Sequence, residues 1–157
     1  MHQIKILNQQ EKNNIIGKLN EQFGVEQLQG ILLMFGKEKL YLFSGSLSEK
    51  ELEKLIEITN IAKTGLYFAK IDERTGDIRL SIEATQLLQN QIKKNIFELD
   101  DRQVNDWMSG SEILIKTNLK GFVIIKHKKD FLGSGKASEN KIGNFIPKER
   151  RLKKRDV

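Results

Sequence analysis

The 157-residue sequence contains no cysteine, one proline and two histidines. A chain without cysteine forms no disulfide, no thiolate zinc site and no iron–sulfur cluster, and it has no cysteine nucleophile. His2 lies at the N-terminus and His127 at the end of a predicted strand, and no carboxylate spacing around them indicates a metal site. We therefore expect neither a metal nor a cofactor.

Long apolar runs are also missing. None approaches the roughly 18 residues that a membrane-spanning helix needs, and Met1–Lys5 lacks the apolar core of a signal peptide. The composition, 38% hydrophobic and 31% charged, is typical of a folded soluble protein, and the length suits one ordinary domain or two small ones. We expect a cytoplasmic protein with no membrane partner.

The sequence shows no pattern for catalysis either. Asp100 and Asp101 are adjacent carboxylates, but their position before a predicted helix is typical of capping rather than of acid–base chemistry. The Ser44–Ser46 segment has no histidine at a suggestive spacing, and no glycine-rich loop indicates a site for a nucleoside cofactor. We predict that the protein is not an enzyme, and a hydrolase or transferase is the least favoured of three functional hypotheses.

Positive charge is concentrated at one end of the chain. From Lys120 onward, twelve Lys or Arg accompany four Asp or Glu, a net charge of +8, whereas the whole chain carries +6. Such segregation creates a field that attracts a polyanion and makes binding depend on salt. Nucleic acid is the favoured partner, and the alternative is that the cationic run is only a solvated tail.

Hydropathy patterns predict a first unit over residues 1–63, a small α/β domain. Short apolar runs predict its strands, and apolar residues at helical spacing predict a helix that Gly24 ends. Ser48–Glu51 forms a capping box that starts a second helix. The predicted strands are Gln3–Leu7, Ile31–Phe35 and Leu40–Phe43, the first helix is Gln9–Phe23, and the second helix turns Leu52, Leu55, Ile56 and Thr59 toward the sheet.

The second predicted unit, residues 64–157, combines short strands with two helices. Ser81 is the predicted N-cap of the first helix, and Asp100–Gln103 is a capping box for the second, which Gly110 ends. Glycine bends between the strands predict a partly closed barrel or a strongly curled sheet. The predicted strands are Leu66–Ile71, Ile78–Leu80, Ile96–Leu99, Gly121–His127 and Phe131–Lys136, the first helix buries Ile82, Leu87, Leu88 and Ile92, and the chain after the second helix is β.

Three motifs near the C-terminus occur in a recognisable order. A strand with a glycine followed by hydrophobic residues begins at Gly121, and a Leu-Gly-x-Gly-Lys bend spans Leu132–Lys136. An Asn-x-x-Pro-Lys motif follows at Asn144–Lys148. Together with Gly65–Lys70 and Glu98–Ser111 upstream, they make residues 64 to 155 resemble a PUA-like RNA-binding domain. That domain is found at the C-terminus of ribosomal-RNA cytosine-5 methyltransferases of the Nop/Sun type.

The resemblance implies an α+β fold, in which a small α/β N-terminal domain precedes a PUA-like mixed β-barrel with short helices. The family often has an aromatic residue and a proline where this chain has Ile78–Ser81, and glycine is frequent in place of Glu149. The chain also lacks the catalytic cysteine of the methyltransferases. The resemblance therefore implies a stand-alone ribosome-biogenesis protein of the archaeal type, and residues 1–63 fit its front domain by size and pattern alone.

The predicted RNA-binding residues are mostly the cations of this domain. Arginine suits bidentate phosphate contacts or base stacking, but pairing with acidic residues of the first domain is the competing account for Arg150 and Arg151. Lys129 is expected to extend the positive surface formed by Lys126 and Lys128. Lys70 and Arg79 are predicted to face the same RNA-binding groove, on the basis of their positive charge alone. The predicted residues are Lys126, Lys128, Lys136, Asn144, Lys148, Arg150, Arg151, Lys153, Lys154 and Arg155.

Two further groups of residues are assigned to packing. Gly133 and Gly135 alternate along a strand, where a barrel corner is favoured over close approach of a ribose-phosphate. Trp107, Phe122 and Phe145 are assigned to the core rather than to base stacking.

The favoured hypothesis is an RNA-binding module in ribosomal-RNA maturation or ribosome assembly, with a methyltransferase or assembly factor as a possible partner. No helix-turn-helix, zinc finger or basic zipper is visible, so we expect no DNA partner. The alternative is a protein-interaction adaptor in which the basic end adds only solubility or weak affinity. Replacing Lys148, Arg150 and Arg151 together by alanine is expected to weaken RNA binding under the first hypothesis alone.

Overall fold

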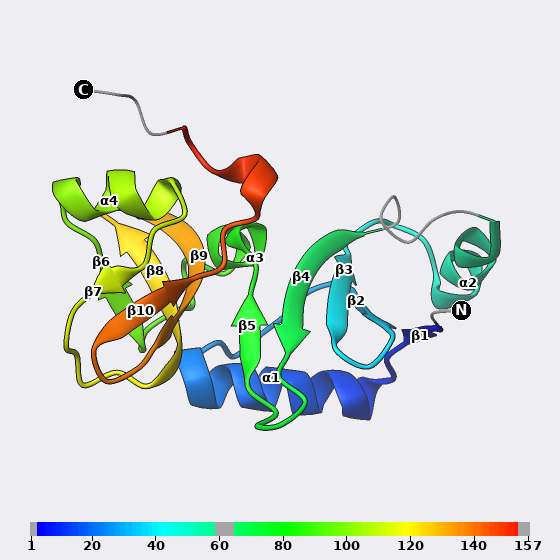
Figure 1. Cartoon of the computed structure of the whole chain (residues 1–157). Coiled ribbons are helices and arrows are strands. Elements are labelled where there is room, and N and C mark those ends of the chain that lie inside the picture. Colours follow the sequence, from blue (N-terminus) through cyan, green and yellow to red (C-terminus); the bar gives the residue numbers. More distant parts are fainter. Residues whose placement is uncertain (1–2, 59–64, 154–157) are drawn as a thin grey trace.

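The computed structural model describes residues 3–58 and 65–153. Its strands form two five-stranded sheets, the second of which is curled into a half-barrel, and short helices lie against both (Figure 1). The predicted α+β class is therefore confirmed. No helix in these two ranges has the length and apolar character to cross a bilayer.

The first sheet is antiparallel throughout, and its strands follow the order of the sequence. Most of the predicted boundaries agree with the structure to within a residue, because short continuous apolar runs mark strands that are covered on both faces. The strands are β1 (Ile4–Ile6), β2 (Ile31–Phe35), β3 (Lys39–Phe43), β4 (Leu66–Ile71) and β5 (Ile78–Leu80).

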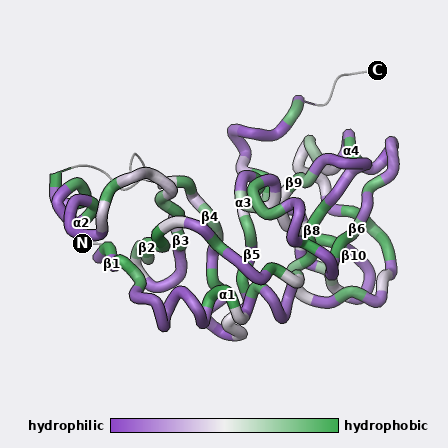
Figure 2. The backbone as a smooth tube through the Cα atoms, turned by 180° about the vertical axis from the view of Figure 1, so that it is seen from behind, coloured by the Kyte–Doolittle hydropathy of each residue, from purple (hydrophilic) through white to green (hydrophobic). Residues whose placement is uncertain are grey.

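Two helices cover opposite faces of this sheet. The helix α1 (Gln9–Phe23) packs Leu19 and Phe23 into the larger core, which also takes Leu32. The next residue, Leu33, points to the other face, where α2 (Glu49–Ile58) covers it. Figure 2 shows that α1 is mostly hydrophilic along its length, as expected for a helix that buries only one stripe.

Local capping explains where these helices begin and end. Gly24, with φ of +84°, ends α1 as predicted, and Ser48 caps α2 by accepting from the backbone N–H of Glu51 (3.2 Å). A third capping box, between Asn8 and Glu11, starts α1 and was not predicted. Thr59, predicted to face the sheet, lies outside the described residues.

The first sheet continues across the predicted domain boundary. The strand β4, assigned to the second unit by the sequence, pairs with β3, and β5 pairs with β4. Hydropathy reveals that a strand exists but not which strand it pairs with, so this continuation was not expected. The division at residues 63 and 64 itself stays a prediction.

The second sheet has the order β6-β8-β9-β10-β7. Its only parallel pair joins β6 to β8, and the other pairs are antiparallel. This sheet is curled into a half-barrel, which confirms the predicted curled sheet (Figure 1). The strands are β6 (Ile96–Glu98), β7 (Ile113–Leu114), β8 (Gly121–His127), β9 (Asp130–Ala137) and β10 (Lys141–Asn144).

Two short helices accompany the second sheet. Ser81 caps α3 (Ile82–Leu87), and Asp100 caps α4 (Asp101–Met108), both as predicted. The indole of Trp107 on α4 is fully buried, which confirms its assignment to the core. The chain is not β to its end, because Lys148–Arg150 forms a 3₁₀ turn, η2.

The predicted burial of Leu87 on α3 is wrong. Leu87 is 56% exposed, whereas Leu88 is buried. Successive helical residues point about 100° apart, and the buried side of α3 is occupied by Ala84 and Thr85. Leu87 therefore faces solvent.

The glycines of β9 are needed for packing. A Cβ at Gly133, where φ is +90°, would lie 2.9 Å from Ile82, and one at Gly135 would lie 2.6 Å from Ile142. Both glycines are buried. This confirms their assignment to a barrel corner rather than to close approach of RNA.

Candidate nucleic-acid interface

The segment after β10 is fastened to the second sheet by Asn144. Its side-chain amide donates to the carbonyl oxygens of Trp107 (2.8 Å) and Ser111 (3.0 Å). Its side-chain oxygen accepts from the backbone N–H of Ile146 (2.8 Å). These bonds give Asn144 a structural role, and its predicted contact with RNA stays a prediction.

Arg151 and Leu152 fasten the segment a second time, against the end of α4. The guanidinium Nε of Arg151 donates to the carbonyl of Ile146 (2.9 Å), and the backbone N–H of Leu152 donates to the carbonyl of Met108 (2.8 Å). The Arg151 side chain lies over Gly110, where a Cβ would come within 2.6 Å of it. The cationic end is therefore held on a folded scaffold as far as Leu152.

Arg150 makes an ion pair with Glu83 of α3. The competing account of the sequence, an internal acidic partner, thus applies to Arg150, although this partner lies beyond residue 63. Its side chain remains 45% exposed, and a guanidinium carries five N–H donors. Arg150 can therefore contact a phosphate while it keeps its carboxylate partner.

Lys148 and Lys153 are the two lysines of this segment. Both side chains point to solvent, and neither forms an ion pair with a described residue. Lys154 and Arg155, also predicted to bind RNA, lie outside the described residues. We call residues Lys148–Lys153 the cationic segment.

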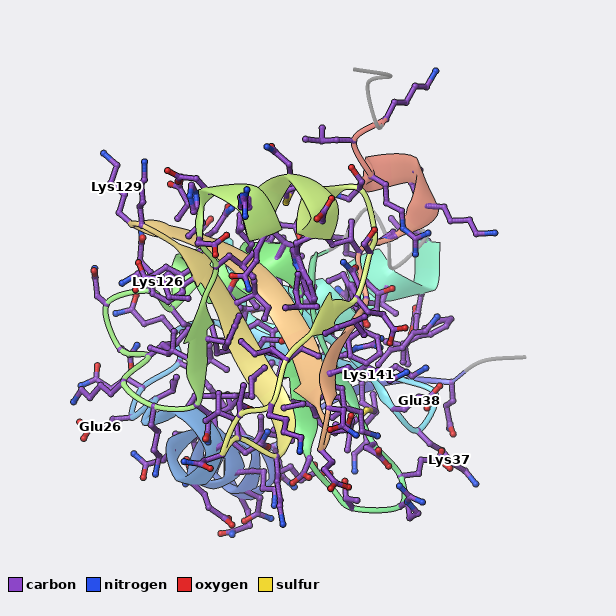
Figure 3. All side chains as sticks on the ribbon, turned by 60° about the vertical axis from the view of Figure 1, so that its left-hand side comes forward. Glu26, Lys37, Glu38, Lys126, Lys129 and Lys141 are labelled. Atoms are coloured by element: carbon purple, nitrogen blue, oxygen red, sulfur yellow. The ribbon has the colours of Figure 1, made fainter. Side chains whose placement is uncertain are left out.

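Lys126 and Lys128 lie elsewhere, at the far end of the β8–β9 hairpin. Lys126 is half-buried, with its ammonium 5.3 Å from the ring centre of Phe131. Lys128 pairs with Asp101 at 3.6 Å. Figure 3 shows Lys126 and Lys129 on one side of the molecule and Glu38 on the other. The structure does not bring all the predicted cations onto one surface.

Asp101 neutralises part of the charge at this hairpin end. A hydrogen bond from His127 Nε2 (2.9 Å) is the main reason why the pKa of Asp101 is lowered, and the charge of Lys128 adds to the effect. Asp101 is therefore ionised at neutral pH. The hairpin end is less cationic than its lysines alone suggest.

Lys136 lies at the opposite end of the same hairpin. It pairs across the ladder with Phe122, and its ammonium is 5.7 Å from the centre of that ring. Lys136 is exposed. It borders a hollow that the sequence did not reveal.

This hollow, of about 320 Å³, lies where the two sheets meet. A smaller hollow of about 80 Å³ adjoins it, and the two share Arg79 and Phe145 as walls. Pro147 and Arg150 line the smaller one, so it borders the cationic segment. We call the two hollows together the junction site.

Arg79 and Phe145 form the centre of the junction site. The guanidinium carbon of Arg79 lies 4.2 Å from the ring centre of Phe145, and Phe122 meets this ring edge-on at 6.0 Å. Phe145 is 37% exposed and Phe122 is half-buried. The assignment of Phe145 to the core is therefore wrong, because Ile142 and Ile146 fill the inner positions of this segment.

Charges in the larger hollow are balanced. The carboxylate of Asp72 is held ionised, because the backbone N–H of Arg74 donates to it (2.9 Å) and lowers its pKa, with a smaller contribution from the charge of Lys136. Glu38 pairs with Lys70 at 3.5 Å. The ionisable side chains around the hollow are Glu38, Lys70, Asp72, Glu73, Arg79 and Lys136.

Lys70 and Arg79 thus share one groove, as the sequence suggested, together with Lys136. Arg79 reaches it because Ile78 and Leu80 are buried in the core, so the residue between them faces the other way. The strict alternation Ile-Arg-Leu was a signal for this orientation. No sequence signal indicated that Phe145 would lie opposite.

Comparison with known proteins relates the second sheet to a known family. The family described as the methyltransferase RsmF PUA domain matches residues 94–152, and no curated protein matches the chain. The matched range begins just before β6, ends within the cationic segment and contains the whole second sheet. A PUA domain suggests RNA binding, so the match supports RNA binding by this chain. Residues 94–152 form a PUA-like domain related to the C-terminal domain of Sun-type ribosomal-RNA methyltransferases.

Proposed function

We propose that the protein binds structured ribosomal RNA during ribosomal-RNA modification or ribosome assembly. The observation that carries this proposal is the PUA-like match over residues 94–152, whose end coincides with the cationic segment. A PUA-like domain supplies the scaffold, and the segment supplies the charge that a sugar-phosphate surface attracts.

The anchoring of the segment supports this proposal. Because Asn144 and Arg151 anchor the chain at both ends of Pro147–Arg150, the backbone that carries Lys148 and Arg150 has a defined course. Preorganised cations lose less conformational entropy on binding than those of a mobile tail. Lys148 and Arg150 are therefore the residues that we expect to contact phosphates most directly.

Several finer predictions belong to the same proposal. We expect the protein to act in the cytoplasm, without catalytic activity of its own, and beside a methyltransferase or assembly factor. RNA is preferred to DNA mainly because of the resemblance to the PUA-like domain, and structured RNA is read through shape, ribose hydroxyls and phosphates.

The structure changes the design of the decisive experiment. Alanine at Arg151 would remove a hydrogen bond and the contact over Gly110, so a variant that includes it tests stability together with binding. The double variant Lys148→Ala/Lys153→Ala removes only exposed charge. Its matched control is Lys50→Ala/Lys54→Ala on α2, which lowers the net charge equally and also changes two exposed lysines.

The measurement is the Kd for a structured ribosomal-RNA fragment over a range of salt concentrations. We expect the Lys148/Lys153 variant to weaken binding about tenfold and to reduce the salt slope by roughly two, since each phosphate contact contributes about 0.9. The Kd of the α2 control should stay within about twofold of that of the parent protein, because charges far from the interface change affinity little. Equal effects of the two variants, or none, would favour the adaptor hypothesis instead.

A further inference from the structure

The exposed ring of Phe145 has no role in the core. Asn144 and Ile146, its neighbours, are both held inward, the first by hydrogen bonds and the second by burial in the second core. Phe145 is therefore turned to the surface by the alternation of the extended chain. Ligand pockets are lined largely by apolar and aromatic side chains, and Phe145 is a wall of both hollows.

The ring is already oriented for stacking. Arg79 lies against it at 4.2 Å, and the edge of Phe122 fixes it from the side. Both contacts restrict the rotation of the phenyl group without enclosing it. Aromatic and guanidinium planes together are the usual surfaces on which proteins stack unpaired bases of RNA.

The balanced charge of the larger hollow favours a base over a phosphate. Three cations and three carboxylates surround it, so it offers hydrogen-bond donors and acceptors with no net attraction for an anion. A nucleobase carries donors and acceptors on a neutral ring. The phosphates beside the base would instead meet the cationic segment, which borders the smaller hollow through Arg150.

The size of the hollow limits what it takes. Its volume of about 320 Å³ lies at the lower end of the 300–1,000 Å³ typical of ligand pockets. One ring system with its ribose suits this space better than a longer stretch of chain. A base paired in a helix cannot enter, because its Watson–Crick edge and stacking faces are occupied.

We propose that the junction site takes a single unpaired nucleobase of the bound RNA, stacked on Phe145 beside Arg79. This inference rests on the proposed function, since the cationic segment brings the RNA to the site. The protein then distinguishes a helix that carries a flipped or bulged nucleotide from an uninterrupted helix. The residues of both sheets take part, so recognition requires the N-terminal sheet as well as the PUA-like domain.

The test uses two RNAs of equal length, a hairpin with one bulged 2-aminopurine and the same hairpin fully paired. We expect the protein to bind the bulged RNA about tenfold more tightly and to change the fluorescence of the 2-aminopurine on binding. Phe145→Leu, which keeps the bulk but removes the aromatic face, should lose this preference and leave the affinity for the paired hairpin unchanged. Phe145→Trp should retain the preference.

Two comparisons separate this inference from the proposed function. Leu114→Ala controls for the loss of an exposed apolar side chain, since Leu114 on β7 is 83% exposed. This variant should bind both hairpins with the affinity of the parent protein. Lys148→Ala/Lys153→Ala should lower the affinity for both hairpins by the same factor. If the parent protein binds both hairpins with one affinity and Phe145→Leu has no effect, the base site is overturned while RNA binding stands; if it binds neither hairpin, both proposals fail.

Discussion

The cationic segment and the junction site differ in how they are built. The segment is continuous in sequence, carries a net positive charge and is anchored by Asn144 before it and by its own Arg151. The junction site joins β5 to the end of β10, has balanced charge and presents an aromatic ring. Charge alone marks a place where RNA is attracted, whereas a stacking surface between two sheets is needed to select one nucleotide.

The two regions depend on the same scaffold. The glycines of β9 let α3, α4 and β10 come close, and these elements carry the residues of both regions. A change in this strand should disturb both regions together, while a surface change should affect one and spare the other.

The strongest disturbance is expected from Gly135→Ala. The added Cβ would lie 2.6 Å from Ile142 and 2.9 Å from Trp107, so the core must shift. We expect the free energy of unfolding to fall by about 2–3 kcal/mol, and RNA binding by both regions to weaken at temperatures near the lowered midpoint. Urea denaturation followed by circular dichroism measures the change.

Gly17→Ala is the matched control for that variant. Gly17 lies within α1, and a Cβ there would meet nothing within 4 Å. The same added methyl group should stabilise the protein by about 0.5–1 kcal/mol through helix propensity. Equal destabilisation by the two substitutions would contradict the packing role of Gly135.

Within the cationic segment, Arg151→Ala is expected to lower mainly stability, whereas Lys148→Ala is expected to lower mainly RNA affinity. Arg151→Ala removes a charge-assisted hydrogen bond and the cover of Gly110, and it should cost about 1–2 kcal/mol of unfolding free energy. Lys148→Ala should leave stability within about 0.5 kcal/mol and weaken RNA binding with a salt slope lower by about 0.9. Thermal unfolding and salt titrations of both variants check this division, which fails if Arg151→Ala is as stable as the parent protein.

At the junction site, Arg79→Lys keeps the charge and removes the planar group. A cation–π contact at an exposed site contributes about 0.5–1 kcal/mol, so we expect roughly threefold weaker binding of RNA with an unpaired nucleotide. Binding of fully paired RNA should not change. A loss of the same size for both RNAs would show that Arg79 acts as a phosphate contact, like the cations of the segment.

The smallest effect is expected at the hairpin end, where Asp101 contacts His127 and Lys128. Because the folded pKa of Asp101 is lowered, its stabilising contribution is present above the ordinary aspartate pKa and is lost as the pH falls through the lowered value. Asp101→Asn should therefore be slightly less stable than the parent protein at neutral pH, and the difference should vanish in strong acid. Unfolding measured as a function of pH tests this, and a difference that grows on acidification would contradict it.

Local features of the fold could be predicted well because they depend on neighbouring residues. Ser81, Asp100 and Gly24 act within one helical turn, so their capping roles follow from short spacings. The cap at Asn8 has the same spacing and was missed. Leu87 was misjudged because the short α3 lets Ala84 and Thr85 take the buried side.

The candidate site was predicted only in part. Arg150 and Arg151 are at the surface expected from their motif, but their internal partners Glu83 and Ile146 were not identified. Phe145 was assigned to the core because aromatic residues are usually buried, and burial is a property of the folded environment. Lys126 and Lys128, predicted to bind RNA with the C-terminal cations, lie instead at the turn end of the β8–β9 hairpin.

The amino-acid sequence by itself determined the helices and most strands, the excess of positive charge at one end and the PUA-like motifs, because each depends on residues that are close along the chain. Only the tertiary structure decided that β4 extends the first sheet and that Arg79 lies against the outward-facing Phe145. These two side chains come from distant parts of the sequence, and their contact depends on how the two sheets pack. Packing of whole layers is set by the shared core of both sheets, which no local pattern describes.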